Sequence, residues 1–481
     1  MKESDTVQLS VIASYEEMFS GEARLELIKT LRVLEGRREV WLAEVGGSTR
    51  RVIAKRFSPG NKQDKESHRE IGGLQELAVR GIRCPRLVFT AKDNGAGLWV
   101  VMDYIENTNE LSNLVLNCTD KELRRKVLRE FFVVLIKHWQ AGVHQTDAHT
   151  RNFLWDGQHI YTIDVGSIRF KSGALSDSKK AAILEEMLGH YTVSFREELL
   201  DVIPEVCQDL GEAGLLCHIQ SERFKCGIAH EEKKNLQRIW RKSQRDCSQF
   251  LSAKHGGRHL ICQRTLDAAL IEKFKTAPEE LMQMGTRLKG GNTCTVQQIE
   301  WEGRPMVIKR YNPKPFFYRI RHRMMLSRAM RSWTNGVVLS NFGIPTVQPV
   351  AVVEEYKFGL LERGYFLMEH FEGESIFDYL NRHEGNDAEF ERVVSSLSKL
   401  FMRMRYLRIV HGDFKAKNLL IHDSEIRLID VDGLRFFVPA RSFPKLFRAD
   451  FQRLLNNWPD GSRIRSLLQD RLTAIFDSPS N

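Results

Sequence analysis

A lysine, two aspartates and an asparagine follow one another in the C-terminal half, in an order that suits phosphate chemistry. They are Lys309, in the strand-like run MVIKRY, and then Asp413, Asn418 and Asp430. A lysine ammonium can offset phosphate charge, and an aspartate can orient an attacking hydroxyl. Amide and carboxylate oxygens are ligands that Mg²⁺ accepts together with phosphate oxygens. These residues therefore predict phosphoryl transfer from a nucleotide.

The N-terminal half holds a second copy of this set, namely Lys55, Asp147, Asn152 and Asp164. In both copies the first aspartate precedes the asparagine by 5 residues, and the asparagine precedes the second aspartate by 12. A shared order with two equal intervals indicates an internal repeat. We therefore expect two modules of one fold, the second with extra residues after its lysine.

The composition is that of a globular protein. The 481 residues are 42% hydrophobic and 28% charged, which excludes a fibrous or wholly disordered chain and suggests two or three domains. A net charge of +10 favours anionic partners without choosing among them. None of the eight cysteines forms a CxxC pair, so a zinc site is not expected. With no secretion signal or transmembrane stretch in view, we expect a reduced, cytoplasmic protein.

The elements that must position these residues alternate between strands and helices. Strand-like alternation or apolar runs occur at 39–45, 50–57, 98–105 and 365–371. Helical periodicity occurs at 66–81, 121–142 and 389–408, and the last two segments lead into the aspartate motifs. A polar, glycine-containing break near 245–260 marks a linker. The pattern predicts an α+β protein with domains at 1–248 and 249–481.

The motifs HGDFKAKNLL with IDVDG, and HQTDAHTRNFL with IDVGS, resemble the bacterial lipopolysaccharide core kinase family, which includes heptose and Kdo kinases. The resemblance implies two tandem protein-kinase-like domains, each with a small β-rich N-lobe and a helical C-lobe. It also implies ATP- and Mg²⁺-dependent phosphorylation of a sugar hydroxyl on the lipopolysaccharide core, at the cytoplasmic face of the inner membrane. Only 51 residues follow Asp430 and no APE-type motif occurs among them, which favours this family over ordinary protein kinases.

The resemblance assigns a role to each residue of the two sets. The lysines, Lys309 and Lys55, would bind the nucleotide phosphates. The aspartates Asp413 and Asp147 would orient the acceptor hydroxyl, and Lys415 would touch the transferring phosphate. The Mg²⁺ ligands would be Asn418, Asp430, Asn152 and Asp164. Asp432 would be either a second metal ligand or a loop acid.

The two copies differ in the residue that should pair with the lysine. In the family, a glutamate on the following helix has this role, and Glu70 fits it for Lys55. The corresponding position in the second copy is Ser332, so Lys309 lacks this partner. The candidates to replace it are Asn335, Glu354 or another acid.

The two copies also differ in the loop that should cover the phosphates, and neither has a full GxGxxG. The second copy offers Gly290 and Gly291, whose backbone N–H groups could approach phosphate. The first copy offers only Gly36, so Arg37 and Arg38 would have to help. Together with its HGD motif, the glycine pair favours the second copy as the active one.

The segment 314–333, in the extra residues of the second copy, carries six lysines or arginines and no acid. We expect residues 314–331 to be either a surface that meets anionic lipid headgroups or phosphorylated sugars, or an ordinary solvated helix. No nucleic-acid module accompanies it, so no nucleic-acid partner is expected.

Three functions compete. The first is a kinase for heptose or Kdo of the lipopolysaccharide inner core, with one module inactive or both active. The second is a kinase for another small molecule or for a protein. The third is a nucleotide-binding tandem pseudokinase that acts as a scaffold in envelope biogenesis.

Overall fold

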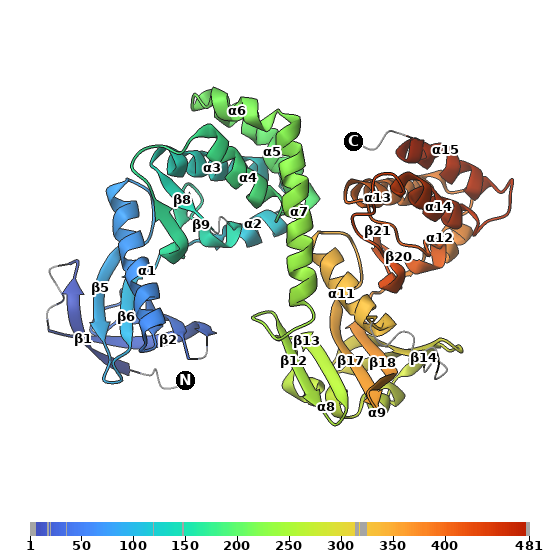
Figure 1. Ribbon diagram of the computed structural model, residues 1–481, viewed down its shortest axis with the longest axis horizontal. Coiled ribbons are helices and arrows are strands. Elements are labelled where there is room, and N and C mark those ends of the chain that lie inside the picture. Colours follow the sequence, from blue (N-terminus) through green and yellow to red (C-terminus); the bar gives the residue numbers. More distant parts are fainter. Residues whose placement is uncertain are drawn as a thin grey trace. The chain divides into compact units, whose positions relative to one another are not determined.

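The computed structural model describes residues 6–16, 19, 21–34, 36–118, 120–146, 149–312, 317 and 325–477 (Figure 1). The chain divides into two compact units. Unit 1 comprises Met1–His190 and Phe195–Ala229, and unit 2 comprises Tyr191–Ser194 and His230–Asn481. Helices and antiparallel sheets occur in both, so the expected α+β class is confirmed. The boundary expected between 248 and 249 stays a prediction.

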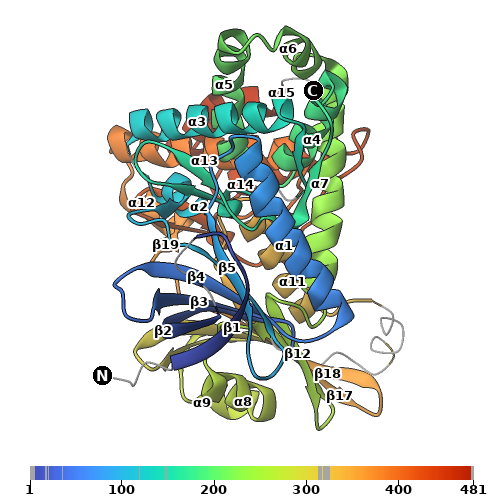
Figure 2. The same cartoon turned by 90° about the vertical axis from the view of Figure 1, so that its left-hand side faces the viewer.

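Unit 1 begins with a closed barrel of six strands, in the order β1-β2-β3-β4-β6-β5. The strands are β1 (Thr6–Ser14), β2 (Glu22–Leu34), β3 (Arg38–Val45), β4 (Arg51–Phe57), β5 (Leu87–Lys92) and β6 (Leu98–Asp103). Alternating apolar side chains such as Leu25, Ala43 and Val101 fill its core. Helix α1 (Asn61–Val79) lies beside β5 (Figure 2). Its Leu74 and Leu77 pack against apolar residues of β5 and β6.

The remainder of unit 1 is mainly helical. It contains α2 (Leu111–Asn117), α3 (Lys121–Gln140), α4 (Asp177–Leu188), α5 (Val193–Asp209), α6 (Ala213–Ile219) and α7 (Glu222–Lys242). The first two residues of α5 and the part of α7 from His230 onwards belong to unit 2. Five short strands lie between α1 and α4 after the barrel: β7 (Asn109–Glu110), β8 (Val143–Gln145), β9 (Phe153–Trp155), β10 (Ile160–Thr162) and β11 (Ile168–Phe170). Asp120 begins α3 by accepting from the backbone N–H groups of Glu122 and Leu123. The helix expected at 121–142 is thereby confirmed.

Unit 2 begins with a seven-stranded antiparallel sheet, in the order β12-β13-β17-β18-β16-β15-β14. Its strands are β12 (Phe250–His255), β13 (Arg258–Gln263), β14 (Thr286–Lys289), β15 (Cys294–Trp301), β16 (Arg304–Tyr311), β17 (Pro349–Lys357) and β18 (Leu360–Glu369). Helices α8 (Ala268–Thr276) and α9 (Pro278–Gln283) cover one face, and α11 (Arg328–Asn341) covers the other (Figure 1). Trp333 of α11 is fully buried against Phe250 and donates to the carbonyl of Ser243.

The helical part of unit 2 surrounds a small sheet of β19 (Glu374–Ser375), β20 (Leu419–His422) and β21 (Glu425–Leu428). Its helices are α12 (Ile376–Arg382), α13 (Asp387–Tyr406), α14 (Phe443–Leu455) and α15 (Arg463–Asp477). Phe401, Phe414, Phe447, Phe451 and Phe476 form an aromatic core. Helix α13 confirms the helix expected at 389–408.

Two expectations of the sequence lie partly or wholly outside the described residues. Asp147 lies wholly outside them. The basic segment 314–331 lies partly outside them, since 314–316 and 318–324 are not described. Among the helices that the structure describes, none combines the length and apolar character needed to cross a membrane.

Candidate active site

The lysine of unit 2 lies on a central strand. Lys309 of β16 pairs in register with Val296 of β15 and Phe366 of β18, and only 6% of it is exposed. Its Nζ donates to Oδ1 of Asp430 at 2.6 Å. Although burial opposes the ammonium charge, the neighbouring Tyr311 and Asp430 raise the pKa of Lys309 to about 12. The lysine is therefore a fixed positive charge.

Asp430 follows β21 in a left-handed backbone conformation, with φ 59° and ψ 50°. Aspartate tolerates this region better than most residues, and the backbone turns there into the segment Val431–Gly433. The N–H of Ile429 donates to the carbonyl of Asn418 at 3.0 Å, which places the two predicted metal ligands on neighbouring segments. Burial opposes ionisation, but Lys309 lowers the pKa of Asp430 below the ordinary aspartate value.

A buried aspartate that the sequence did not reveal holds the HGD loop. Asp450 of α14 is completely buried, and its carboxylate accepts from the backbone N–H groups of His411 at 2.7 Å and Gly412 at 3.1 Å. Burial raises the pKa of Asp450 despite these bonds. The sequence feature that could have revealed Asp450 is its place, as an acid, on the helix face that carries Phe447, Phe451 and Leu454.

The HGD loop presents its aspartate to solvent. The side chain of Asp413 is 49% exposed, and Lys415 Nζ lies 2.8 Å from its Oδ1. Asn418 Nδ2 donates to the Asp413 carbonyl at 2.8 Å and to its Oδ2 at 3.3 Å. By contrast His411 is buried, and burial lowers its pKa, so it supports the loop in neutral form. Asp413 is thus the loop group that can reach an external hydroxyl.

The glycine pair lies at the turn between β14 and β15. Gly290 and Gly291 are both exposed. The carbonyl of Gly291 accepts from Asn312 Nδ2 at 2.9 Å. The turn leads into β15, which pairs directly with β16, the strand that carries Lys309. Such a turn can offer backbone N–H groups to an anion.

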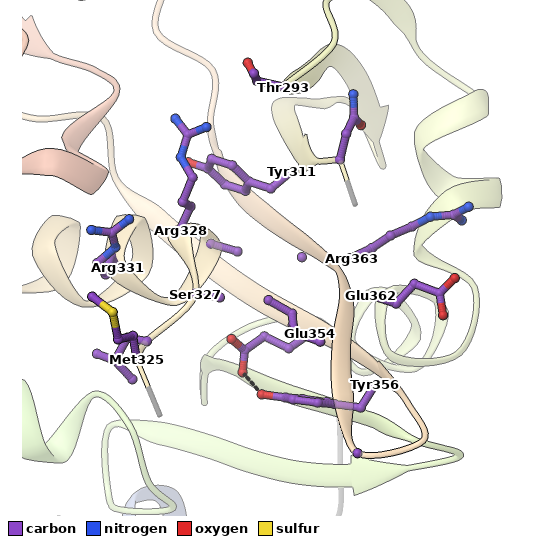
Figure 3. A pocket seen from close by; sticks show the side chains of 16 residues that line it. Thr293, Tyr311, Met325, Ser327, Arg328, Arg331, Glu354, Tyr356, Glu362 and Arg363 are labelled. Atoms are coloured by element: carbon purple, nitrogen blue, oxygen red, sulfur yellow. Dashed lines mark hydrogen bonds between the residues drawn. The ribbon is translucent and has the colours of Figure 1, made fainter. Parts of the chain in front are cut away.

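The residues that the sequence offered as partners for Lys309 make other contacts instead. Asn335 donates to the carbonyl of Val431 at 2.8 Å, and Glu354 accepts from the Tyr356 hydroxyl at 2.8 Å (Figure 3). The hydroxyl of Ser332 lies 2.6 Å from that of Tyr311. The acid that replaces the expected glutamate as the direct partner of Lys309 is Asp430.

Unit 1 contains a related arrangement. Lys55 of β4 donates to Glu70 of α1, and both side chains are buried. Lys55 Nζ also lies 3.8 Å from Oδ1 of Asp164, whose backbone is again left-handed. Arg38 lies 3.7 Å from the same oxygen, whereas Arg37 pairs with Glu66 at 2.8 Å. Of the two arginines near Gly36, only Arg38 therefore joins the lysine cluster.

The asparagine of unit 1 has the backbone setting of its counterpart. The N–H of Asn152 donates to the carbonyl of His149 at 2.8 Å, and its carbonyl accepts from Ile163 at 2.9 Å. The corresponding bonds of Asn418 measure 2.8 and 3.0 Å, the second being accepted from Ile429. The same two backbone hydrogen bonds therefore flank this asparagine in both units.

The predicted ligands of unit 2 fit Mg²⁺ chemically. Asn418 uses its amide nitrogen on Asp413, which leaves the amide oxygen for another partner, and Asp430 supplies a carboxylate. Among the described residues no group of three or more His, Cys, Asp or Glu side chains could hold a metal by itself. A site with two protein ligands suits Mg²⁺, which usually completes its coordination with phosphate and water oxygens.

Comparison with known proteins identifies the C-terminal region. The model of the lipopolysaccharide kinase (Kdo/WaaP) family matches residues 273–456. Residues 273–456 form a domain of this family. The matched range runs from α8 to the residue after α14 and includes Lys309, Asp413, Asn418 and Asp430. The C-terminal region is therefore kinase-like, whereas unit 1 lies outside the match.

Two solved structures are similar to parts of the chain. One is WaaP in complex with acyl carrier protein, with 15% identity, a TM-score of 0.31, and coverage of 45% of this chain and 88% of that one. The other is the PknI kinase domain of M. tuberculosis, with 17% identity, a TM-score of 0.24, and coverage of 30% and 58%. No curated protein matches the sequence.

Proposed function

We propose that the protein is an ATP-dependent phosphotransferase that acts on a sugar hydroxyl of the lipopolysaccharide inner core, with unit 2 as the catalytic unit. The observation that carries this proposal is that the family domain contains Lys309 paired with Asp430 and, on the HGD loop, the exposed Asp413. A lysine for phosphate and a solvent-accessible carboxylate for a hydroxyl are the groups that phosphoryl transfer requires.

Each residue has a distinct task in the proposed reaction. Lys309 binds phosphate oxygens of ATP and offsets their charge. Asp413 orients the sugar hydroxyl and accepts its proton as the new oxygen–phosphorus bond forms and the bond to ADP breaks. Lys415, at 2.8 Å from Asp413, is placed to donate to the transferring phosphoryl group. Asn418 and Asp430 would hold Mg²⁺, which supplies charge neutralisation at the phosphates.

The acceptor and location rest on the family match. Heptose and Kdo are the proposed acceptor sugars, on a glycolipid at the cytoplasmic face of the inner membrane. The basic segment 314–331 is the proposed contact with anionic lipid. Arg328 is less suited to that contact than the sequence suggested, because its guanidinium forms an ion pair with Asp432 at 2.5 Å.

We propose a supporting role for unit 1, as a second nucleotide-binding module of the same fold. The support is the buried Lys55–Glu70 pair, with Asp164 nearby. Asn152 and Asp164 would hold Mg²⁺ there, and Asp147 would orient a hydroxyl if this unit also catalyses transfer.

The deciding experiment measures phosphate transfer from ATP to purified lipopolysaccharide core acceptors. We expect Asp413→Asn to abolish transfer, whereas the matched Asp423→Asn, at a side chain that is 92% exposed, leaves it unchanged. Asp147→Asn reports the contribution of unit 1. Mg²⁺-dependent ATP binding without transfer to any acceptor would contradict the proposal in favour of a scaffold, and transfer to a protein alone would replace the sugar acceptor.

A further inference from the structure

The charged clusters around the two strand lysines differ at aligned positions. Counting back from Gly81 and Gly343, which follow α1 and α11, aligns the two helices residue by residue. The lysines and the left-handed aspartates align the strands and loops. Among the positions that differ, unit 1 first, are Phe57 and Tyr311, Glu66 and Arg328, Glu70 and Ser332, and Gly166 and Asp432.

In unit 1 the acid beside the lysine comes from the helix. Glu70 is 1% exposed and accepts from Lys55. A Cβ added at Gly166 would lie 3.0 Å from Oε2 of Glu70. A larger side chain at position 166 would therefore compete with the glutamate for one space.

In unit 2 the second acid of the cluster, in addition to Asp430, comes from the loop instead. Asp432 is 8% exposed, and it stands at the position of Gly166. The hydroxyls of Tyr311 and Ser332 are hydrogen-bonded to each other at 2.6 Å, on the strand and helix positions that carry Phe57 and the glutamate in unit 1. This carboxylate is thus on the helix in unit 1 and on the loop in unit 2.

The second cation also comes from a different element, since it is Arg38 of strand β3 in unit 1 and Arg328 of helix α11 in unit 2. Arg328, in the first turn of α11, pairs with Asp432 at 2.5 Å and lies with its Cζ 5.0 Å from the centre of the Tyr311 ring (Figure 3). Lys309 Nζ lies 5.1 Å from the same ring centre. The cluster therefore holds two cations, two carboxylates and one ring. Unit 1 reaches the same balance with Lys55, Arg38, Glu70 and Asp164.

The geometry points to Arg328 and Asp432 as the positioning pair of the unit 2 site, doing for Lys309 and Asp430 what Glu70 does for Lys55. This inference rests on the proposed phosphotransferase function. Asp432 contributes the second negative charge beside Lys309, and Arg328 ties that charge to α11. Without Arg328, the half-buried carboxylate of Asp430 and the buried carboxylate of Asp432, two residues apart, would have only Lys309 nearby as a cation and would repel each other.

The test transplants the unit 1 arrangement into unit 2. Asp432→Gly alone should lower kcat by about 100-fold, because a small displacement of a phosphate-binding group is costly. The triple variant Asp432→Gly, Ser332→Glu, Tyr311→Phe restores an acid from the helix and should recover most of that loss. Arg328→Ala should be impaired, and Arg328→Lys should be closer to wild type.

The competing role for Asp432 is a second Mg²⁺ ligand. As a positioning residue, it should leave the Mg²⁺ concentration for half-maximal ATP binding unchanged while kcat falls. Two results would overturn the inference. One is a shift of that Mg²⁺ concentration together with a triple variant that is as inactive as Asp432→Gly. The other is full activity of Asp432→Gly. If wild type transfers no phosphate to any acceptor, the proposed function fails. The inference is then decided by ATP affinity, which Asp432→Gly should weaken. Recovery of ATP affinity in the triple variant would support the inference, and no recovery would overturn it.

Discussion

The Nζ of Lys309 lies 2.6 Å from Oδ1 of Asp430, although the two residues are 121 positions apart in the chain. Each side chain keeps the other charged, since the pKa of the lysine is raised and that of the aspartate is lowered. A nucleotide and Mg²⁺ would meet a site that already carries its positive and negative groups in place. Such preorganisation is the main source of electrostatic catalysis.

Lys309→Met should lower kcat by about 100-fold or more, because it removes the charge that offsets phosphate and leaves Asp430 half-buried without its cation. The measurement is phosphate transfer at saturating ATP. Lys399→Met, at an exposed position of α13, is the control and should retain activity. Activity of Lys309→Met within twofold of wild type would exclude the lysine from the reaction.

Glu70→Gln should lower the free energy of unfolding of unit 1 by about 3 kcal/mol, because it breaks a buried ion pair and leaves the lysine without its carboxylate. Denaturant unfolding measures this. Glu66→Gln removes the neighbouring ion pair with Arg37, whose side chain is 46% exposed, and should cost under about 1 kcal/mol. Equal effects of the two substitutions would contradict the buried Lys55–Glu70 pair.

Asp450→Ala should destabilise unit 2 by about 2 kcal/mol, because the N–H groups of His411 and Gly412 lose their buried acceptor. Transfer activity should fall with it, since the loop of Asp413 is no longer fixed. Urea unfolding and kcat are the two measurements, and Asp470→Asn on exposed α15 surface is the control. A variant that is less stable but fully active would separate loop support from catalysis.

Acid should destabilise unit 1 through His138. Burial lowers the pKa of His138 to about 4, and its Nε2 lies 3.1 Å from the hydroxyl of Thr162. The folded state therefore holds the neutral ring, so its contribution is complete above the unfolded pKa of about 6.5. It should be lost at about 1.4 kcal/mol per pH unit as the pH falls from there towards 4.

His138→Gln should flatten this dependence, as followed by unfolding at several pH values. His159→Gln is the control, since the side chain of His159 is 40% exposed. A pH dependence that survives in His138→Gln would place its origin elsewhere.

The sequence was informative where a signal is local. Helices α3 and α13 and strands β3, β4 and β6 follow from apolar periodicity, and the two aspartate motifs from their equal intervals. It also indicated correctly that Ser332 could not pair with Lys309 as a glutamate would. It did not indicate Asp430 as the substitute, because that contact depends on how a strand and a distant loop meet.

Asp450 was missed for a related reason. Its function depends on the buried backbone N–H groups opposite it, and those lie 38 and 39 residues earlier in the chain. An isolated acid in an apolar helix face is a visible anomaly, but only the packed structure gives it partners. The barrel of unit 1 was likewise not predicted, since β1 and much of β2 carry exposed side chains and closure occurs through β1 and β5.

The left-handed backbone at Asp430 and Asp164 decides how these residues should be probed. Alanine at either position would add backbone strain of about 1 kcal/mol to the loss of charge, so an inactive alanine variant would be ambiguous. Asparagine accepts the same φ and ψ and has nearly the same shape. Comparison of Asn with Ala at each position would therefore separate the contribution of the negative charge from the contribution of chain geometry.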